Sequence, residues 1–358
     1  MKQMDITILS CLSSKCGIGR YTEELASAVN KKNGQVKLFR KNTGKEDYII
    51  AYPHRSFKNL KHLVAPYYLK KAVEKTDSEV WHADNIDAFT ALDWSGKGKN
   101  KKKVVTVHDA IPLLYPHKSW IDGKAFHYHL HKTAKKADSI ITVSKTSKKD
   151  LVEIAGIDEA KIQVVYNGIS HNILYPLAEK PKHERFNIRY IGGLGAIHKN
   201  AVALIETARE LKEMNFDYDM EIGSGNAHDT ILPELVEKYN LENHVHFKGF
   251  IPDNQLREFL GEGDVFLYPS LYEGFGFPPL EAMACGTAVV ASDTGSLAEI
   301  LQKGALLSKP NPNDLALNII KLAENPDLKF QLEKEAIENA TNFTWEKTAE
   351  EMIRIYRA

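Results

Sequence analysis

Short apolar runs alternate with longer amphipathic segments along the chain, which is the pattern of an α/β protein with parallel sheets. The apolar runs of the first half are too short for helices and predict buried strands. These predicted strands span residues 5–9, 36–39, 79–82, 103–108, 139–143 and 164–166. Segments with helical periodicity predict helices over residues 20–30, 128–137 and 145–155.

A polar, proline-containing stretch, residues 171–186, separates this series from a second one. The second series predicts strands over residues 188–191, 218–222 and 245–247, and helices over residues 201–214, 230–239 and 254–261. We therefore expect an N-terminal domain over residues 1–172 and a C-terminal domain over residues 173–344. Two such α/β domains form a cleft, and their ligands lie at the carboxyl ends of the strands.

The most informative stretch is residues 264–292, DVFLYPSLYEGFGFPPLEAMACGTAVVAS. It predicts a buried strand, then a glycine-rich loop that follows Glu273, and then a helix that contains Glu281. Two prolines suit the first turn of that helix, where a missing N–H costs nothing. Free backbone N–H groups and the positive end of the helix would bind an anion there. Two carboxylates beside an anion site suit a sugar nucleotide.

With seven residues between them, Glu273 and Glu281 resemble the E-x7-E signature of retaining glycosyltransferases with the GT-B fold, in particular the GT4 family. In that family the first Glu holds hydroxyls of the donor sugar and the second holds the nucleotide ribose. The resemblance implies two Rossmann-like domains that face each other across a cleft. It also implies that the last helix, within residues 345–358, crosses back to the first domain. The loop amides of Gly274, Phe275, Gly276 and Phe277 would then contact the leaving group.

Two further residues match positions of that family. His108 ends a predicted strand in VVTVHDAIPLL, where the family has a His that contacts the donor sugar, and Asp109 is expected to orient a backbone group or His108. Lys199, in YIGGLGAIHKN, matches the Lys that neutralises the departing diphosphate. The family commonly has an Arg where this chain has Gly193, so one expected cation is missing; His198 or Arg20 would have to replace it.

Two glycine-rich turns and Ile251 complete the expected donor site. Gly17 and Gly19 follow the first strand, where the family's loop lies near the phosphates and the acceptor. Gly223 and Gly225 resemble the family's G-x-G near the nucleotide. Ile251 lies where the family packs the nucleobase.

Charge is unevenly distributed, although the net charge is zero. Residues 1–170 hold 29 Lys and Arg against 18 Asp and Glu, and residues 171–358 hold the reverse. The basic half indicates an anionic partner or an ordinary solvated surface. Residues 55–75 mix basic, aromatic and aliphatic side chains, and Pro66 predicts two short helices there. We expect this stretch either to pack on the core or to dock on an anionic membrane.

The sequence therefore predicts a retaining, metal-independent hexosyltransferase, similar to GT4 members that build bacterial surface polysaccharides. Its partners would be a nucleotide-sugar donor, GDP-mannose first, and a glycan or lipid-linked acceptor; no cofactor and no nucleic acid are expected. Three scattered cysteines and the lack of a leader or spanning segment favour the cytoplasm, with peripheral contact at the inner face of the membrane. The alternatives are a non-catalytic sugar-nucleotide-binding subunit, or an epimerase or phosphorylase with the GT-B fold.

Overall fold

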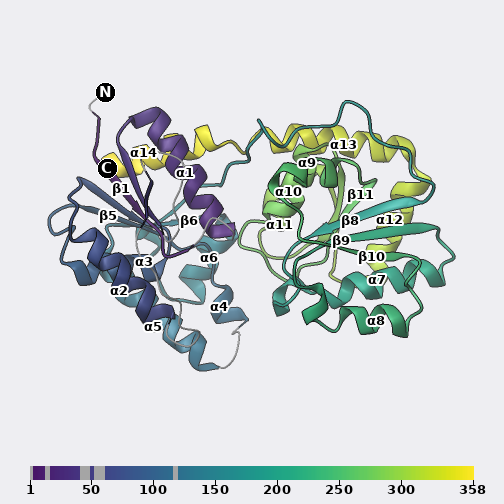
Figure 1. The fold of residues 1–358 in the computed structure, drawn as a ribbon, viewed down its shortest axis with the longest axis horizontal. Helices are drawn as coiled ribbons and strands as arrows, with labels where there is room; N and C mark the ends of the chain where they lie inside the picture. The colour runs from purple at the N-terminus through teal and green to yellow at the C-terminus, as the bar shows by residue number, and fades with distance from the viewer. Residues whose placement is uncertain (1–2, 13–16, 41–48, 52–60, 116–119) are drawn as a thin grey trace. The chain divides into compact units, whose positions relative to one another are not determined.

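A computed structural model of the chain describes residues 3–12, 17–40, 49–51, 61–115 and 120–358. The chain divides into two compact units (Figure 1). The first unit comprises residues 1–168 together with 345–358, and the second comprises residues 169–344. The chain therefore passes from one unit to the other twice, after Gly168 and after Thr344.

The first unit is built on a parallel sheet in the order β3-β2-β1-β4-β5-β6-β7. Its strands are β1 (Ile6–Leu9), β2 (Val36–Arg40), β3 (Ile49–Ala51), β4 (Val80–Ala83), β5 (Lys102–Thr106), β6 (Ser139–Thr142) and β7 (Ile162–Val164). Its helices are α1 (Gly17–Asn33), α2 (Lys61–Val73), α3 (Ile86–Ser95), α4 (Ile111–Leu114), α5 (Trp120–Lys136), α6 (Lys145–Glu153), the turn η1 (Glu159–Lys161) and α14 (Trp345–Arg357).

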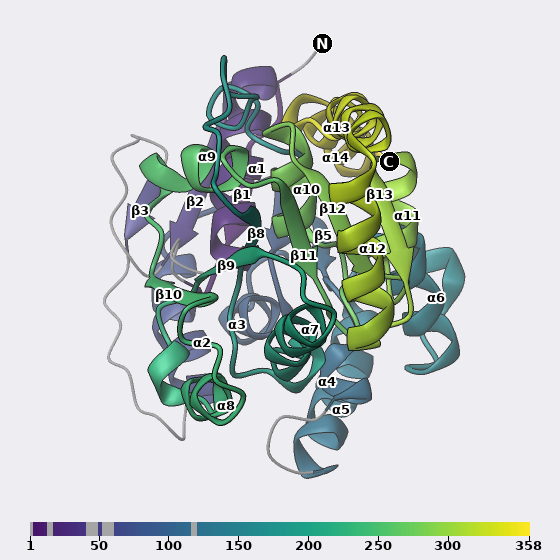
Figure 2. The ribbon, with the colours of Figure 1, turned by 90° about the vertical axis from the view of Figure 1, so that its right-hand side faces the viewer.

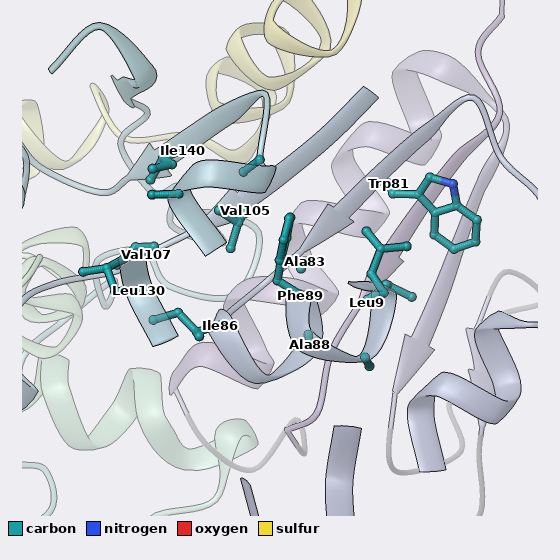
Figure 3. Close-up of a cluster of buried hydrophobic side chains, with 14 of the residues drawn as sticks. Leu9, Trp81, Ala83, Ile86, Ala88, Phe89, Val105, Val107, Leu130 and Ile140 are labelled. Carbon is teal, nitrogen blue, oxygen red and sulfur yellow. The ribbon is translucent and has the colours of Figure 1, made fainter. Parts of the chain in front are cut away.

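Helices cover both faces of this sheet. The final helix α14 packs beside α1, and Figure 1 shows the two on the upper side of the strands. On the other side α2 packs on α3, and α3 packs on α5. Figure 3 shows part of the core between these helices and the sheet, where Trp81 and Phe89 are the largest of the labelled side chains.

The second unit has a parallel sheet in the order β10-β9-β8-β11-β12-β13. Its strands are β8 (Phe186–Ile191), β9 (Tyr218–Gly223), β10 (Val245–Gly249), β11 (Val265–Tyr268), β12 (Ala288–Ser292) and β13 (Ala305–Ser308). Its helices are α7 (Val202–Glu213), α8 (Leu232–Lys238), α9 (Asp253–Gly261), α10 (Phe277–Ala284), α11 (Leu297–Leu301), α12 (Pro312–Glu324) and α13 (Pro326–Ala340), with the turns η2 (Ile197–Lys199), η3 (Ala227–Asp229) and η4 (Gln302–Gly304). Helix α12 packs on α7 and α13 packs on α10, on opposite faces (Figure 2).

The predicted α/β class with parallel sheets is confirmed in both units. The prediction missed α3, because its sequence is apolar on nearly all sides and lacks a clear helical period. Its usable signal was Asn85, whose side chain accepts the Ala88 N–H as an N-cap. The strand predicted over residues 164–166 ends at Val164, and the strand predicted over 103–108 ends at Thr106. His108 consequently lies in the loop that follows β5.

The prediction of two short helices around Pro66 is wrong, because α2 is one helix with Pro66 inside it. Ala65, Leu69 and Val73 recur every four residues along one face, and all three are buried in the core. An interior proline costs about 3 kcal/mol. Burial of two large aliphatic side chains offsets that cost at roughly 1.5–3 kcal/mol each.

One face of α2, within the basic stretch of residues 55–75, therefore packs on the core of the first unit. Leu69 is buried and does not face solvent. On the exposed side, Tyr67 lies under the Lys71 ammonium at 4.6 Å from the ring centroid, and Lys70 pairs with Glu74 at 2.6 Å. Residues 55–60 lie outside the described part of the chain, as does Cys16. No helix among the described residues is long and apolar enough to span a membrane.

Candidate active site

The second sheet reverses its winding direction between β8 and β11. Strands β9 and β10 extend the sheet on one side of β8, while β12 and β13 extend it beyond β11. The loops after β8 and β11 consequently diverge at their carboxyl ends, and open α/β sheets bind ligands at this switch point. Lys199 follows β8 and Glu273 follows β11, so the sheet order alone brings these two predicted residues together.

The turn that carries Lys199 is fixed against the loop after β11. Lys199 ends the turn η2, and Asn200 then adopts a left-handed conformation with φ of 53°. The backbone N–H of Leu271 donates to the carbonyl of His198 at 2.7 Å, and the Asn200 side chain donates to the carbonyl of Pro269 at 3.0 Å. Two loops that are distant in sequence are thereby joined on either side of Lys199.

Glu273 is 6% exposed and is held by three side chains. The Lys199 ammonium donates to both carboxylate oxygens, at 2.8 Å to Oε1 and 2.9 Å to Oε2. The hydroxyls of Tyr268 and Ser270 donate to Oε1 at 2.9 and 2.7 Å. The contacts are unequal, because Oε1 receives three of these donors and Oε2 only the ammonium. Oε2 is therefore the oxygen better placed to accept a further hydrogen bond.

Tyr268 connects the two charged groups. Its hydroxyl also lies 3.2 Å from the Lys199 ammonium, and its ring stacks on that of Tyr190 at 5.9 Å. Burial and the neighbouring Glu273 carboxylate raise the pKa of Tyr268 well above its usual value. The phenol thus stays protonated and remains a hydrogen-bond donor.

The loop between Glu273 and α10 depends on two glycines. Gly276 precedes α10 with φ of 98°, and a Cβ there would lie 2.7 Å from a methyl group of Leu297. A Cβ on Gly295 would lie 2.7 Å from the backbone N and O of Glu273. The loop is thus packed directly on backbone. Of its predicted contacts, Phe275 is 4% exposed, and Gly274 and Phe277 flank the bend that leads into α10.

Glu281 lies in the middle of α10 and is 5% exposed. Its position differs from that of Glu273, which belongs to the loop. The two glutamates of the E-x7-E pattern therefore occupy different elements, and the Lys199 contacts belong to Glu273.

The predicted nucleotide residues gather at the ends of β9 and β10. A Cβ on Gly223 would lie 2.8 Å from a side-chain carbon of Ile251, so the two residues are packed together. A Cβ on Gly225 would lie 3.5 Å from the Cβ of Phe250, a residue that is 71% exposed. The N–H of Gly192 donates to the carbonyl of Gly223 at 3.2 Å, which joins this region to the turn of Lys199. The place of the missing Arg is open, because a Cβ on Gly193 would meet no atom within 4 Å.

In the first unit, the switch point lies between β1 and β4. Gly17 and Gly19 belong to the first turn of α1, which follows β1. Asp84 follows β4 and accepts a hydrogen bond from the Thr22 hydroxyl at 2.9 Å. The ring Nε2 of His108, after β5, lies 3.2 Å from the carbonyl of Asp84. The sheet thus gathers the predicted residues of this unit around Asp84.

His108 is a neutral ring in this setting. Burial lowers its pKa to about 4, so it is uncharged at neutral pH. With Nε2 donating to the Asp84 carbonyl, Nδ1 is the acceptor of the neutral ring. Asp109 accepts the N–H of Ile111 at 2.9 Å, which confirms the expectation that it orients backbone.

The sequence contains one Asp-x-Asp, at Asp217–Tyr218–Asp219. It lies at the start of β9, the sheet edge opposite the Lys199 turn. Arg185 pairs with Asp217 at 3.1 Å and with Asp219 at 3.4 Å. In the described part of the chain, no group of three or more His, Cys, Asp or Glu side chains is arranged to hold a metal ion.

Three side chains of these sites were missed from the sequence: Tyr268, Ser270 and Asp84. Tyr268 ends a strand of apolar residues, so it reads as core. Ser270 lies three residues before Glu273, a spacing without a distinctive pattern. Asp84 had a usable signal, since a carboxylate directly after a buried strand is placed at the ligand-binding edge of a parallel sheet.

Comparison with protein families agrees with this geometry. Residues 16–172 match the model described as Glycosyltransferase Family 4, and residues 178–343 match the model described as Glycosyl transferases group 1. The chain is a glycosyltransferase of the GT4 type. The two matched segments lie almost entirely in the first and second units, respectively.

The enzyme is similar to the O-antigen chain mannosyltransferase RfbU of Salmonella typhimurium, with 30% identity over 229 residues. That alignment covers 63% of this chain and 62% of the relative, so the chain spans less than two thirds of it. The sucrose-phosphate synthase of Thermosynechococcus elongatus superposes with a TM-score of 0.84 at 22% identity, over 99% of this chain and 98% of the other.

The HepE protein of Anabaena, solved in complex with UDP-glucose, superposes with a TM-score of 0.78 at 17% identity, over 99% of each chain. At these identities the structural likeness concerns the fold, and it shows that the enzyme has the GT-B fold.

Asp84 gives the enzyme a testable dependence of stability on pH. Burial raises the pKa of this carboxyl group from 3.8 to about 7. Between roughly pH 4 and pH 7 the folded chain therefore keeps a proton that the unfolded chain has released. The contribution of Asp84 to the free energy of unfolding falls as pH rises through that window, by up to about 1.4 kcal/mol per pH unit. Asp84→Asn does not titrate.

We predict that the melting temperature of Asp84→Asn, relative to the parent, rises between about pH 5 and about pH 8. The comparison with the parent cancels the contributions of the buried histidines. Thermal denaturation curves of both proteins across this range measure the difference. A constant difference across the range would contradict a shifted Asp84.

Proposed function

We propose that the enzyme is a retaining, metal-independent glycosyltransferase that transfers a hexose from a nucleotide-diphosphate sugar to a glycan or lipid-linked acceptor. The observation that carries this proposal is the buried Lys199–Glu273 pair at the switch point of the second sheet. It supplies a cation and a hydroxyl-binding carboxylate side by side, which are the two groups that a sugar diphosphate requires.

In the proposed reaction, Lys199 neutralises the charge that develops on the leaving diphosphate. The amides of the Gly274–Phe277 loop and the start of α10 add hydrogen-bond donors to the same anion. Glu273 accepts hydroxyls of the transferred sugar, chiefly through Oε2, while Tyr268 and Ser270 keep the carboxylate oriented. Glu281 holds the ribose, and Gly223, Gly225 and Ile251 form the nucleotide end of the site.

The neutral ring of His108 would contact the donor sugar from the first unit. With Nε2 directed to the Asp84 carbonyl, Nδ1 would accept a sugar hydroxyl, and the low pKa keeps the ring uncharged at neutral pH. Gly17 and Gly19 would approach the phosphates or the acceptor at the start of α1. A retaining reaction conserves the anomeric configuration of the donor in the product.

For the donor we propose GDP-mannose first and UDP-sugars second. The similarity to RfbU, an O-antigen mannosyltransferase, supports mannose and a surface-polysaccharide acceptor. The similarity to HepE, which was solved with UDP-glucose, supports the uridine nucleotide. The exposed Phe250 next to Gly225 offers a flat apolar surface to either base.

Glu273 and Glu281 should act on different parts of the donor. Glu273→Gln keeps the shape but loses the charge, so we predict a large fall in turnover while nucleoside diphosphate binding survives. Glu281→Ala should weaken nucleoside diphosphate binding by about 1.5–3 kcal/mol, the value of a hydrogen bond to a charged group. Calorimetry with GDP and UDP measures both variants. Equal losses of nucleotide affinity would disprove this division of roles.

Lys199→Ala tests the leaving-group role. An interaction that strengthens as charge develops lowers kcat more than it changes KM. We predict a loss in kcat on the order of 10²-fold or more. Lys180→Ala is a control, because Lys180 also pairs with a glutamate, Glu333, on the same unit.

The assay, run with GDP-mannose and UDP-glucose and with EDTA, also tests metal independence. A Lys199→Ala rate close to that of the parent would rule out this role, and activity restored only by Mg²⁺ would rule out metal independence.

A lipid-linked acceptor would bring the enzyme to a membrane. We propose that the exposed side of α2, with Tyr67, Lys70 and Lys71, contributes to peripheral docking on anionic lipid. Each basic residue near such a surface adds about 1 kcal/mol. Sedimentation with anionic vesicles should show salt-sensitive binding that weakens in Lys70→Glu/Lys71→Glu, while Lys238→Glu, on α8 of the second unit, serves as control. Equal binding by both variants would exclude α2 as the docking surface.

A further inference from the structure

The two segments that connect the units are paired to each other. Ile169 forms a parallel bridge with Thr344, and the N–H of Ile169 donates to the carbonyl of Phe343 at 3.0 Å. The ring of His171 adds a contact to the same carbonyl at 3.2 Å. We call residues 343–345 the crossover segment. Its backbone is fixed by these contacts with Ile169 and His171.

Phe343 packs against the Gly274–Phe277 loop, which we call the donor loop. The ring of Phe343 meets that of Phe275 edge to face, with centroids 5.8 Å apart. Phe275 in turn packs on Phe277 at 5.1 Å. Phe275 and Phe343 are both nearly fully buried. The loop whose amides would bind the diphosphate thus rests on Phe343.

Trp345 packs against Tyr21, whose ring contacts that of His108. The ring of Trp345, the first residue of α14, lies 5.9 Å from that of Tyr21, and Tyr21 meets His108 edge to face at 4.8 Å. The Tyr21 hydroxyl lies 3.2 Å from the Thr106 hydroxyl, and both residues are buried. Trp345 therefore sets the position of the ring on which His108 rests.

The same helix is anchored at its far end. The Tyr356 hydroxyl lies 2.7 Å from Nδ1 of His82, and Nε2 of His82 lies 2.8 Å from the Thr106 hydroxyl. Thr106 is thus shared between Tyr356, through His82, and Tyr21. With both ends of α14 held by buried groups, its first turn cannot shift without disturbing the surroundings of Tyr21.

We propose that Phe343 and Trp345 are positioning residues that couple the donor loop to His108. A single residue, Thr344, separates them in the chain, yet Phe343 packs on Phe275 in the second unit and Trp345 packs on Tyr21 in the first. Packed aromatic contacts change between discrete arrangements rather than deforming smoothly. Occupation of the Gly274–Phe277 loop by a diphosphate would alter the seating of Phe275 on Phe343, and the crossover segment would pass this change to Trp345, Tyr21 and His108. This coupling rests on the donor site proposed above.

The distribution of tryptophans makes the coupling measurable. All four, Trp81, Trp94, Trp120 and Trp345, belong to the first unit, and none belongs to the unit that carries Lys199 and Glu273. We would titrate the parent and Trp345→Phe with GDP and with UDP, and measure tryptophan emission and calorimetric binding in parallel. The difference between the two proteins isolates the emission of Trp345.

We expect the Trp345 emission to change with the same saturation curve as nucleotide binding. In Phe343→Leu, or in the milder Phe343→Met if the first variant unfolds, nucleotide should still bind but the emission change should be lost. Phe186→Leu is the matched control, because Phe186 makes a similar edge-to-face pair with Phe216 at the opposite end of β8. It should keep the full change.

A merely structural role for the crossover aromatics would lower stability without affecting this signal. Nucleotide binding without any change of Trp345 emission would overturn the coupling while leaving the donor site intact. An unaltered change in both Phe343 variants would overturn it as well. Absence of nucleotide binding by the parent would instead remove the donor site, and the coupling with it.

Discussion

A carboxylate buried at the edge of a parallel sheet must be neutralised, and the second unit is organised around this requirement. Glu273 is almost fully removed from water, and an unpaired charge there would cost several kcal/mol. The Lys199 ammonium meets both of its oxygens, and two hydroxyls complete its hydrogen bonds. The pair can form only because β8 and β11 are neighbours in the sheet, so strand order and charge balance depend on each other.

The local backbone follows from the same pair. Asn200 turns the chain after Lys199, and Gly295 allows the loop of Glu273 to lie directly against backbone. The ion pair also gives the site its chemistry, since an ammonium that already compensates one anion is well placed to meet another. In the proposed reaction, a diphosphate would increase the negative charge near Lys199, and a sugar hydroxyl would take the place of the ammonium on Glu273. Under this proposal, the contacts between Lys199 and Glu273 keep both groups in place for a charged ligand.

The sequence predicted those parts of the site that carry a periodic or motif signal. Glu273, Glu281 and Lys199 were selected as candidates because loop glycines and helix-start prolines punctuate the chain around them. The contacts of Tyr268 and Asp84 were not predictable in this way, because they depend on which strands become neighbours. Helix α2 shows the opposite case: Pro66 wrongly predicted two short helices, because burial of Leu69 and Val73 outweighs the local preference of proline. Local signals thus indicated the candidate residues, and long-range packing decided which side chains contact them.

The most direct test of the account is a crystal structure of the enzyme with an intact nucleotide sugar, the donor chosen by turnover. The account predicts that the Lys199 ammonium lies within hydrogen-bonding distance of a diphosphate oxygen, and that Glu273 accepts a hydroxyl of the sugar. A diphosphate bound away from the turn after β8, with Lys199 still held by both oxygens of Glu273, would contradict it.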